Sequence, residues 1–138
     1  MARLTHEDAS RLLAEVFAPW VQDLQLTIEA IDAESAVLRM PFSERLCRQG
    51  GVLCGQALMA LADTAMVFAV SAASGGYRPM TTVDMSTHMM RPIAQADVLA
   101  EARILRLGRT MAFGHVIMRA KGDKRPAVTA TVAYALLS

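Results

Sequence analysis

The long apolar stretch GQALMALADTAMVFAV, residues 55–70, contains one acidic side chain, Asp63. Its other polar side chains are Gln56 at the start and Thr64 beside the acid. A carboxylate in such surroundings can lie on a narrow solvated stripe of a mostly buried helix. It can also be retained for chemistry, as a general base or a nucleophile. On the first interpretation Asp63 faces only solvent, and on the second it faces a bound substrate.

The loop that precedes this stretch, SERLCRQGG, supplies further candidates for substrate binding. Arg48 carries a planar set of donors and Gln49 an amide, and both precede the glycine pair. Cys54 stands where a helix N-terminus would favour a thiolate, but no His accompanies it in a motif, and a small packed thiol is the favoured interpretation. Cys47, Cys54 and a distant His match no zinc spacing, so we expect no metal.

Three more polar residues could serve a bound substrate. Thr64 could orient a water molecule, although a Thr hydroxyl that binds its own helix carbonyl is an equal alternative. Arg91 is expected at a strand end and Arg109 at a hairpin tip, where either could hold phosphate groups. Exposed arginines of this kind are more often simply solvated.

Composition limits the class of protein. The 138 residues are 54% hydrophobic and 20% charged, with a net charge of +1, and they form no basic block of the kind that binds nucleic acid. The first residues, MARLTHEDASRLLAEVF, contain acids and no continuous apolar core, so we expect no signal peptide and a cytoplasmic protein. An apolar chain of this size is expected to associate with copies of itself, as a dimer or a tetramer.

Residues 52–73 are long enough to cross a membrane, but we expect a buried helix instead. Asp63 falls at the centre of this segment, where a charge costs several kcal/mol. Alanine, its commonest residue, contributes little to membrane insertion. We therefore expect no membrane partner.

The elements that must position these residues can be predicted from periodicity. Thr5 is expected to cap a first helix, with Asp8 completing a capping box, and Pro19 is expected to end that helix. Residues 24–32 and 35–42 alternate as two strands joined by a turn. The long helix follows from residue 55, and the pair Gly75-Gly76 is expected to stop it.

Four further strands are expected after the long helix. The first spans residues 81–92, where alternate side chains are expected on opposite faces of the strand. One face would carry Val83, Met85, Thr87 and Met89, and the other Thr82, Asp84, Ser86 and His88. The others span 97–107, 110–120 and 127–137, with tight turns that predict antiparallel hairpins. One long apolar helix whose only cover is an antiparallel sheet implies an α+β fold, a single domain over 1–138 with the sheet curved around the helix.

The order of elements and three segments, GGVLCGQALMALADTAM, VDMSTHMMRP and LRLGRTMAFGHVIMRA, resemble the hotdog-fold acyl-CoA thioesterases. The nearest group is the PaaI-like, or phenylacetic-acid-pathway, thioesterases. The resemblance extends over about residues 24–137, and its most specific part is LADTA, placed after the helix-start glycine. Asp63 and Gly55 match the family's acid and glycine. Arg48 stands where the family usually has Asn, Cys54 where it has His, and Gln56 where it has a second Gly.

The resemblance implies an acyl-CoA thioesterase that needs no cofactor beyond the coenzyme A of its substrate. Backbone N–H groups at a helix start have no partners within the helix, so the N–H of Gly55 could stabilise an oxyanion. Asp63 lies about 12 Å further along the helix axis, too far to act on the same carbonyl. Two antiparallel helices would bring Asp63 of one chain near Gly55 of the other, and the resemblance implies such shared sites at a subunit interface.

Two other functions compete with this one. The missing Asn and His suggest a catalytically weak protein that binds an acyl-CoA or an acyl carrier on the same fold. A dehydratase would need a catalytic His near the helix entrance, where Cys54 stands instead, and ranks last.

Overall fold

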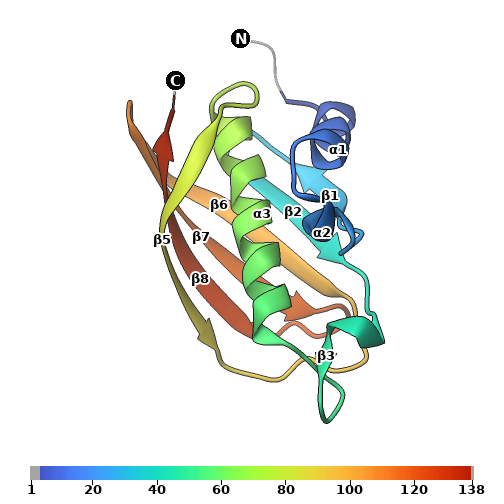
Figure 1. Ribbon diagram of the computed structural model, residues 1–138. Helices are drawn as coiled ribbons and strands as arrows, with labels where there is room; N and C mark the ends of the chain where they lie inside the picture. The colour runs from blue at the N-terminus through green and yellow to red at the C-terminus, as the bar shows by residue number, and fades with distance from the viewer. Residues whose placement is uncertain (1–3, 138) are drawn as a thin grey trace.

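A six-stranded antiparallel sheet curves around the long helix α3, Gly55–Ala73, in the computed structural model, which describes residues 4–137 (Figure 1). The strands are β1 (Thr27–Ile31), β2 (Ser35–Met40), β5 (Met80–Met89), β6 (Val98–Leu107), β7 (Met111–Ala120) and β8 (Val128–Leu136). Their order across the sheet is β1-β2-β6-β7-β8-β5. This is the hotdog architecture, and it confirms the expected α+β fold.

The helix α3 fills the concave side of the sheet because its small and large apolar residues allow close packing. Eleven of its residues are buried, among them Leu61, Met66 and Phe68. The helix stops where expected, since Gly75 takes a φ of 77° and the N–H of Gly76 donates to the Ser71 carbonyl. Among the described residues, α3 is the one helix long and apolar enough to cross a membrane, and it is instead packed inside the domain.

Short connections, 32–34 and 108–110, join β1 to β2 and β6 to β7, and each strand pair is antiparallel, as predicted. The tight hairpin predicted between β7 and β8 is wrong, because the connection between these strands runs over residues 121–127. The connection from α3 leads into β5, which pairs with β8 alone and therefore forms one edge of the sheet. Most of β5 is solvent-exposed in the single chain. An edge strand with two exposed faces leaves a row of backbone groups available for pairing.

The N-terminal region differs in one respect from the prediction. Helix α1, His6–Glu15, begins with the predicted capping box, in which the Thr5 hydroxyl accepts from the N–H of Asp8 and the Asp8 carboxylate accepts from the N–H of Thr5. The prediction that Pro19 ends this helix is wrong. Pro19 is the first residue of a second short helix, α2 (Pro19–Gln22), because a first-turn position needs no N–H donor.

The first predicted strand is also shorter than expected. Residues 24–26 lie outside β1 because Gln25 takes a left-handed backbone conformation with a φ of 57°, although Leu24 and Leu26 are buried. The loop before α3 has structure of its own. It contains a 3-10 turn, η1 (Glu44–Leu46), and a small hairpin of β3 (Cys47–Arg48) and β4 (Val52–Leu53).

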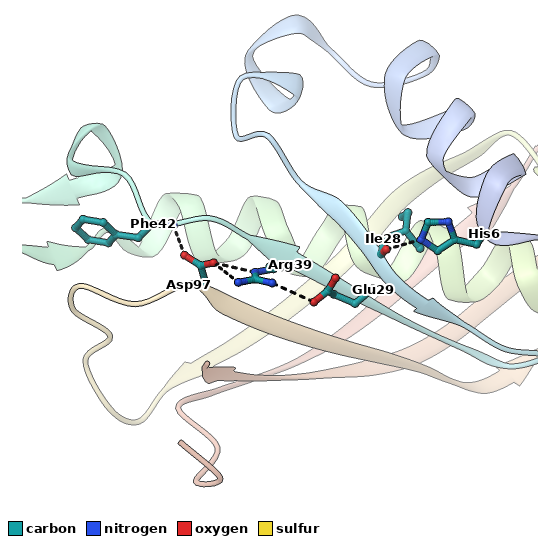
Figure 2. A network of polar contacts seen from close by, with 6 residues as sticks. All are labelled: His6, Ile28, Glu29, Arg39, Phe42 and Asp97. Atoms are coloured by element: carbon teal, nitrogen blue, oxygen red, sulfur yellow. Dashed lines mark hydrogen bonds and ion pairs between the residues drawn. The ribbon is translucent and has the colours of Figure 1, made fainter. Parts of the chain in front are cut away.

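A polar network fixes the segment that follows β2 (Figure 2). The Asp97 carboxylate accepts from the backbone N–H of Phe42 at 2.8 Å and from the Arg39 guanidinium at 2.8 Å. Arg39 also pairs with Glu29 at 3.4 Å. The hydrogen bond from the Phe42 N–H, followed by that from Arg39, lowers the pKa of Asp97. The network thus anchors the chain between β2 and η1, close to the start of α3.

Candidate active site

Between Gly55 and Val67, the five side chains of α3 that are not buried form one stripe, with Asp63 on it. We call this set the open stripe; its members are Gln56, Met59, Ala60, Asp63 and Val67. Their spacing of three or four residues puts them on one face of the helix. The sheet of the same chain covers the other faces, so Asp63 lies on a narrow open stripe of a mostly buried helix.

Asp63 is held by two hydroxyl groups from neighbouring strands. The Thr82 hydroxyl on β5 donates to Oδ1 of Asp63 at 2.8 Å. The Tyr134 hydroxyl on β8 lies 2.7 Å from the same Oδ1 and 2.6 Å from the Asp63 backbone carbonyl oxygen. Among the described residues, no side chain or backbone donor is hydrogen-bonded to Oδ2. The carboxylate therefore has one occupied and one available oxygen.

Sequence periodicity did not single out either hydroxyl, and a β-bulge is the reason in the case of Thr82. The sequence pattern put Val83 on the same face as Met85, with Thr82 opposite, and this prediction is wrong. The register shifts between Thr82 and Asp84, so that Thr82 lies opposite Tyr134 and Met85 opposite Val132. Val83 is left 59% exposed. The extra residue of the bulge thus turns Thr82 toward α3.

Tyr134 follows the alternation of β8, where Val128, Ala130 and Val132 are the other buried residues of its face. It is 1% exposed, and burial, followed by the charge of Asp63, raises the pKa of its hydroxyl. The hydroxyl therefore stays protonated and able to donate. The available signal was a lone phenol on an otherwise aliphatic strand face, which periodicity classifies only as core.

The N-terminus of α3 provides the second part of the site. Cys54 is the N-cap residue, and its side chain makes no capping hydrogen bond. Gly55 is the first helical residue, and a Cβ built there would lie 3.0 Å from both Sδ and Cε of Met89. The absence of a side chain at Gly55 therefore leaves room for the Met89 thioether against the helix start.

Two cavities open beside this first turn. One, of about 350 Å³, is lined by Gly55, Arg48, Arg91, Met89 and other residues of β4 and the segment after β5. The other, also about 350 Å³, lies between α2, the segment after β2 and the helix start. Its lining includes Trp20, Phe42, Leu46, Cys54 and Gln56. The first cavity has two cationic side chains, Arg48 and Arg91, among apolar ones, and the second combines aromatic and aliphatic side chains with Arg45 and Asp23.

The remaining candidates lie in different places. Arg48 is exposed and donates to the carbonyl of Gln49 at 3.2 Å, and Gln49 is exposed in the β3–β4 turn. Thr64 is 4% exposed and so does not belong to the open stripe. Arg109 lies at the tip of the β6–β7 hairpin, beside a separate hollow with Arg106. Within residues 4–137, no three His, Cys, Asp or Glu side chains come together as metal ligands would.

Comparison with known proteins identifies the family. Residues 50–127, which contain Gly55, Asp63 and Thr82, match the thioesterase superfamily. The chain belongs to the thioesterase superfamily. The match covers α3 and runs to the end of the β7–β8 connection, and Tyr134 lies just beyond it.

Individual thioesterase-superfamily structures support the assignment. A "putative thioesterase" from Silicibacter sp. TM1040 is 31% identical, with a TM-score of 0.86 over 96% of this chain and 92% of that one. Thioesterase superfamily member 2 of zebra fish is 24% identical, with the same TM-score of 0.86 over 97% and 99%, and shows a shared fold. Among curated sequences, the "putative esterase Ta0293" of Thermoplasma acidophilum is 27% identical over 111 residues, 73% of this chain and 77% of that protein.

Proposed function

We propose that the protein is an acyl-CoA thioesterase of the PaaI-like group, with Asp63 as the base or nucleophile. The observation that carries the proposal is the state of Asp63: a carboxylate on the open stripe, with Oδ1 engaged by two hydroxyls and Oδ2 available. Superfamily membership supports thioester hydrolysis in general. The motif LADTA, at the family's spacing from Gly55, supports the narrower group.

The reaction needs a carbonyl-polarising donor and an activated water. In the proposed mechanism, the N–H of Gly55 hydrogen-bonds to the thioester oxygen, at the positive end of the α3 dipole. Asp63 accepts a proton from water as the water oxygen bonds to the carbonyl carbon. The tetrahedral intermediate then expels the coenzyme A thiolate, which takes up the proton, and leaves a carboxylic acid. Direct attack by Asp63 would instead give an anhydride that water hydrolyses to the same products.

Two chains are needed for one such site. Gly55 and Asp63 are separated by about 12 Å along the axis of α3, so one carbonyl cannot reach both within a chain. Two features support pairing of two copies. The chain's own sheet leaves the open stripe of α3 uncovered, and the edge strand β5 has a neighbouring strand on one side only. In an antiparallel pair, Asp63 of one chain acts beside Gly55 of the other.

The two cavities suggest how the substrate is divided. Arg48 and Arg91, in the cavity that contains Gly55, are proposed to bind phosphate groups of coenzyme A. Arg109 lies in a separate hollow at the opposite end of the sheet, so it is proposed as a further contact from the second chain. The cavity beside Cys54 is proposed to accept the acyl group against its apolar side, which Trp20, Phe42 and Leu46 form. Gln49 remains a proposed substrate contact through its exposed amide, and Thr64, which is 4% exposed, is proposed to act through a water molecule beside Asp63.

A protein that binds acyl-CoA but turns it over weakly is the second candidate. It is favoured by Arg48 and Cys54, which replace the family's Asn and His, and by the absence of a capping hydrogen bond from Cys54. The two candidates differ in kcat and not in affinity, so a turnover assay distinguishes them.

The test is a panel of aryl-, short-chain and long-chain acyl-CoAs, scored by release of free thiol. We expect turnover of at least one class, and Asp63→Asn should lower kcat by about 10²–10⁴ while the protein still elutes as the wild type does. Asn keeps the size and the hydrogen-bond acceptor of Asp63, so the change removes chiefly the charge. An Asp63→Asn variant with wild-type turnover would overturn the role of Asp63.

A further inference from the structure

We propose that Tyr134 is a positioning residue for Asp63, which fixes the carboxylate so that Oδ2 is the oxygen that reacts. The inference rests on the proposed function, because it assigns Tyr134 a part in the reaction that Asp63 performs. It adds a residue from β8, outside the segment that matches the superfamily.

The geometry of the Tyr134 hydroxyl is the first support. It lies 2.7 Å from Oδ1 and 2.6 Å from the backbone carbonyl oxygen of Asp63, so it contacts the side chain and the main chain of one residue. A carboxylate that could turn about its side-chain bonds would present either oxygen. With Oδ1 held against the helix backbone, the carboxylate has one orientation, and Oδ2 is left for water or substrate.

The surroundings of Tyr134 are the second support. Its ring is 1% exposed on a strand face that otherwise buries Val and Ala, so a phenylalanine would fill the same space. The polar atom that distinguishes Tyr from Phe has Asp63 as its hydrogen-bond acceptor. Since burial raises the pKa of Tyr134, the phenol is protonated at neutral pH and can donate.

The contribution of Thr82 does not replace that of Tyr134. Thr82 donates to the same Oδ1 but stands next to the β5 bulge, where the pairing with β8 is irregular. Tyr134 stands on β8, which pairs with β7 on one side and β5 on the other. The buried phenol is therefore the more rigid of the two supports, and its loss should loosen the carboxylate even when Thr82 is present.

Tyr134→Phe tests the inference by removing the hydroxyl and keeping the ring. We expect a folded protein whose kcat is lower by about tenfold or more, because small displacements of a reacting group are costly. KM should stay within about twofold, since Tyr134 lies behind Asp63 and is buried from solvent. Tyr77→Phe is the matched control, since Tyr77 is the other tyrosine and is 40% exposed, and it should retain wild-type kcat.

The double variant Asp63→Asn/Tyr134→Phe separates positioning from general stability. If Tyr134 acts through Asp63, the second substitution should change kcat by less than about twofold once the carboxylate is gone. Equal losses in both backgrounds would mean that Tyr134 is only structural and would overturn the inference. Tyr134→Met provides a second hydroxyl-free variant of comparable bulk if the phenylalanine variant does not elute as a folded protein.

The outcomes for the two proposals can be told apart. Wild-type kcat in Tyr134→Phe, together with an inactive Asp63→Asn, would refute the role of Tyr134 and leave the proposed function standing. Wild-type kcat in Asp63→Asn would overturn the proposed chemistry and, with it, the role of Tyr134.

Discussion

A mixed dimer of Gly55→Val and Asp63→Asn chains should regain about half of the wild-type kcat, whereas each variant alone should be nearly inactive. The expectation follows from the positions of the two residues on α3, about 12 Å apart along the helix axis. If each site combines Gly55 of one chain with Asp63 of the other, two-fold symmetry gives two equivalent sites per dimer.

The magnitude follows from counting the parts of each site. In the mixed dimer, one site receives both damaged residues and the other receives both intact ones, which leaves one working site of the two. The Gly55→Val change is expected to be effective because a Cβ at this position already lies 3.0 Å from the Met89 thioether, and valine adds two further methyl groups. These must displace Met89 or occupy the space in front of the N–H that is proposed to bind the oxyanion.

The assay uses two affinity tags, one on each variant chain, with co-expression and sequential purification on both tags. Free-thiol release is then compared for the mixed dimer, both variant homodimers and a doubly tagged wild-type dimer as the control. A mixed dimer as inactive as its parents would refute the shared site. Substantial activity in either purified homodimer would refute the assigned role of the substituted residue.

Three further predictions follow from individual residues. Arg48→Ala should raise KM at least several-fold in the thiol-release assay if Arg48 binds coenzyme A phosphates, while Cys54→Ala should cost little; an acyl group trapped covalently on Cys54 would contradict the second expectation. Gly114→Ala should lower the free energy of unfolding by about 1–3 kcal/mol in urea titrations, because the new Cβ would overlap the Met66 thioether and lie 2.8 Å from a β6 carbonyl oxygen. An unchanged free energy of unfolding would contradict this, and would mean that β7 and Met66 of α3 can move apart without cost. The lowered pKa of Asp97 means that its charged form stabilises the fold above about pH 4, the range of an unfolded Asp, and that this stability is lost as pH falls through the lower folded pKa. Asp97→Asn should therefore lower Tm at neutral pH and reduce the loss of Tm on acidification. If Tm falls with pH in the variant as much as in the wild type, Asp97 is not the source of the acid sensitivity.

The local elements of the fold were predictable because short-range chemistry specifies them. The capping box at Thr5, the helix stop at Gly75 and the tight hairpin turns each depend on residues within a few positions of one another. The central helix was predictable from its length and apolar content. One acid in that helix, eight residues after Gly55, was enough to nominate Asp63.

Some local details could not be predicted in the same way. Pro19 starts a helix rather than ending one, because a proline is compatible with either boundary and only the path of the chain decides. Gln25 shortens β1 by taking a left-handed conformation that its alternating neighbours do not indicate. In both cases the path of the whole chain decides the local conformation, and neither the proline rule nor strand alternation contains that information.

The sequence by itself determined the fold, the helix and the acid, and only the tertiary structure decided what holds the acid. Tyr134 is 71 residues from Asp63 in the chain, and its hydroxyl reaches the carboxylate because β8 passes under α3. Thr82 reaches it because a bulge shifts the register of β5 by one residue. Side chains alternate between the two faces of a strand, so one extra residue moves every following side chain to the opposite face. The position of that extra residue is fixed by pairing with the neighbouring strand, which the sequence pattern of β5 does not contain.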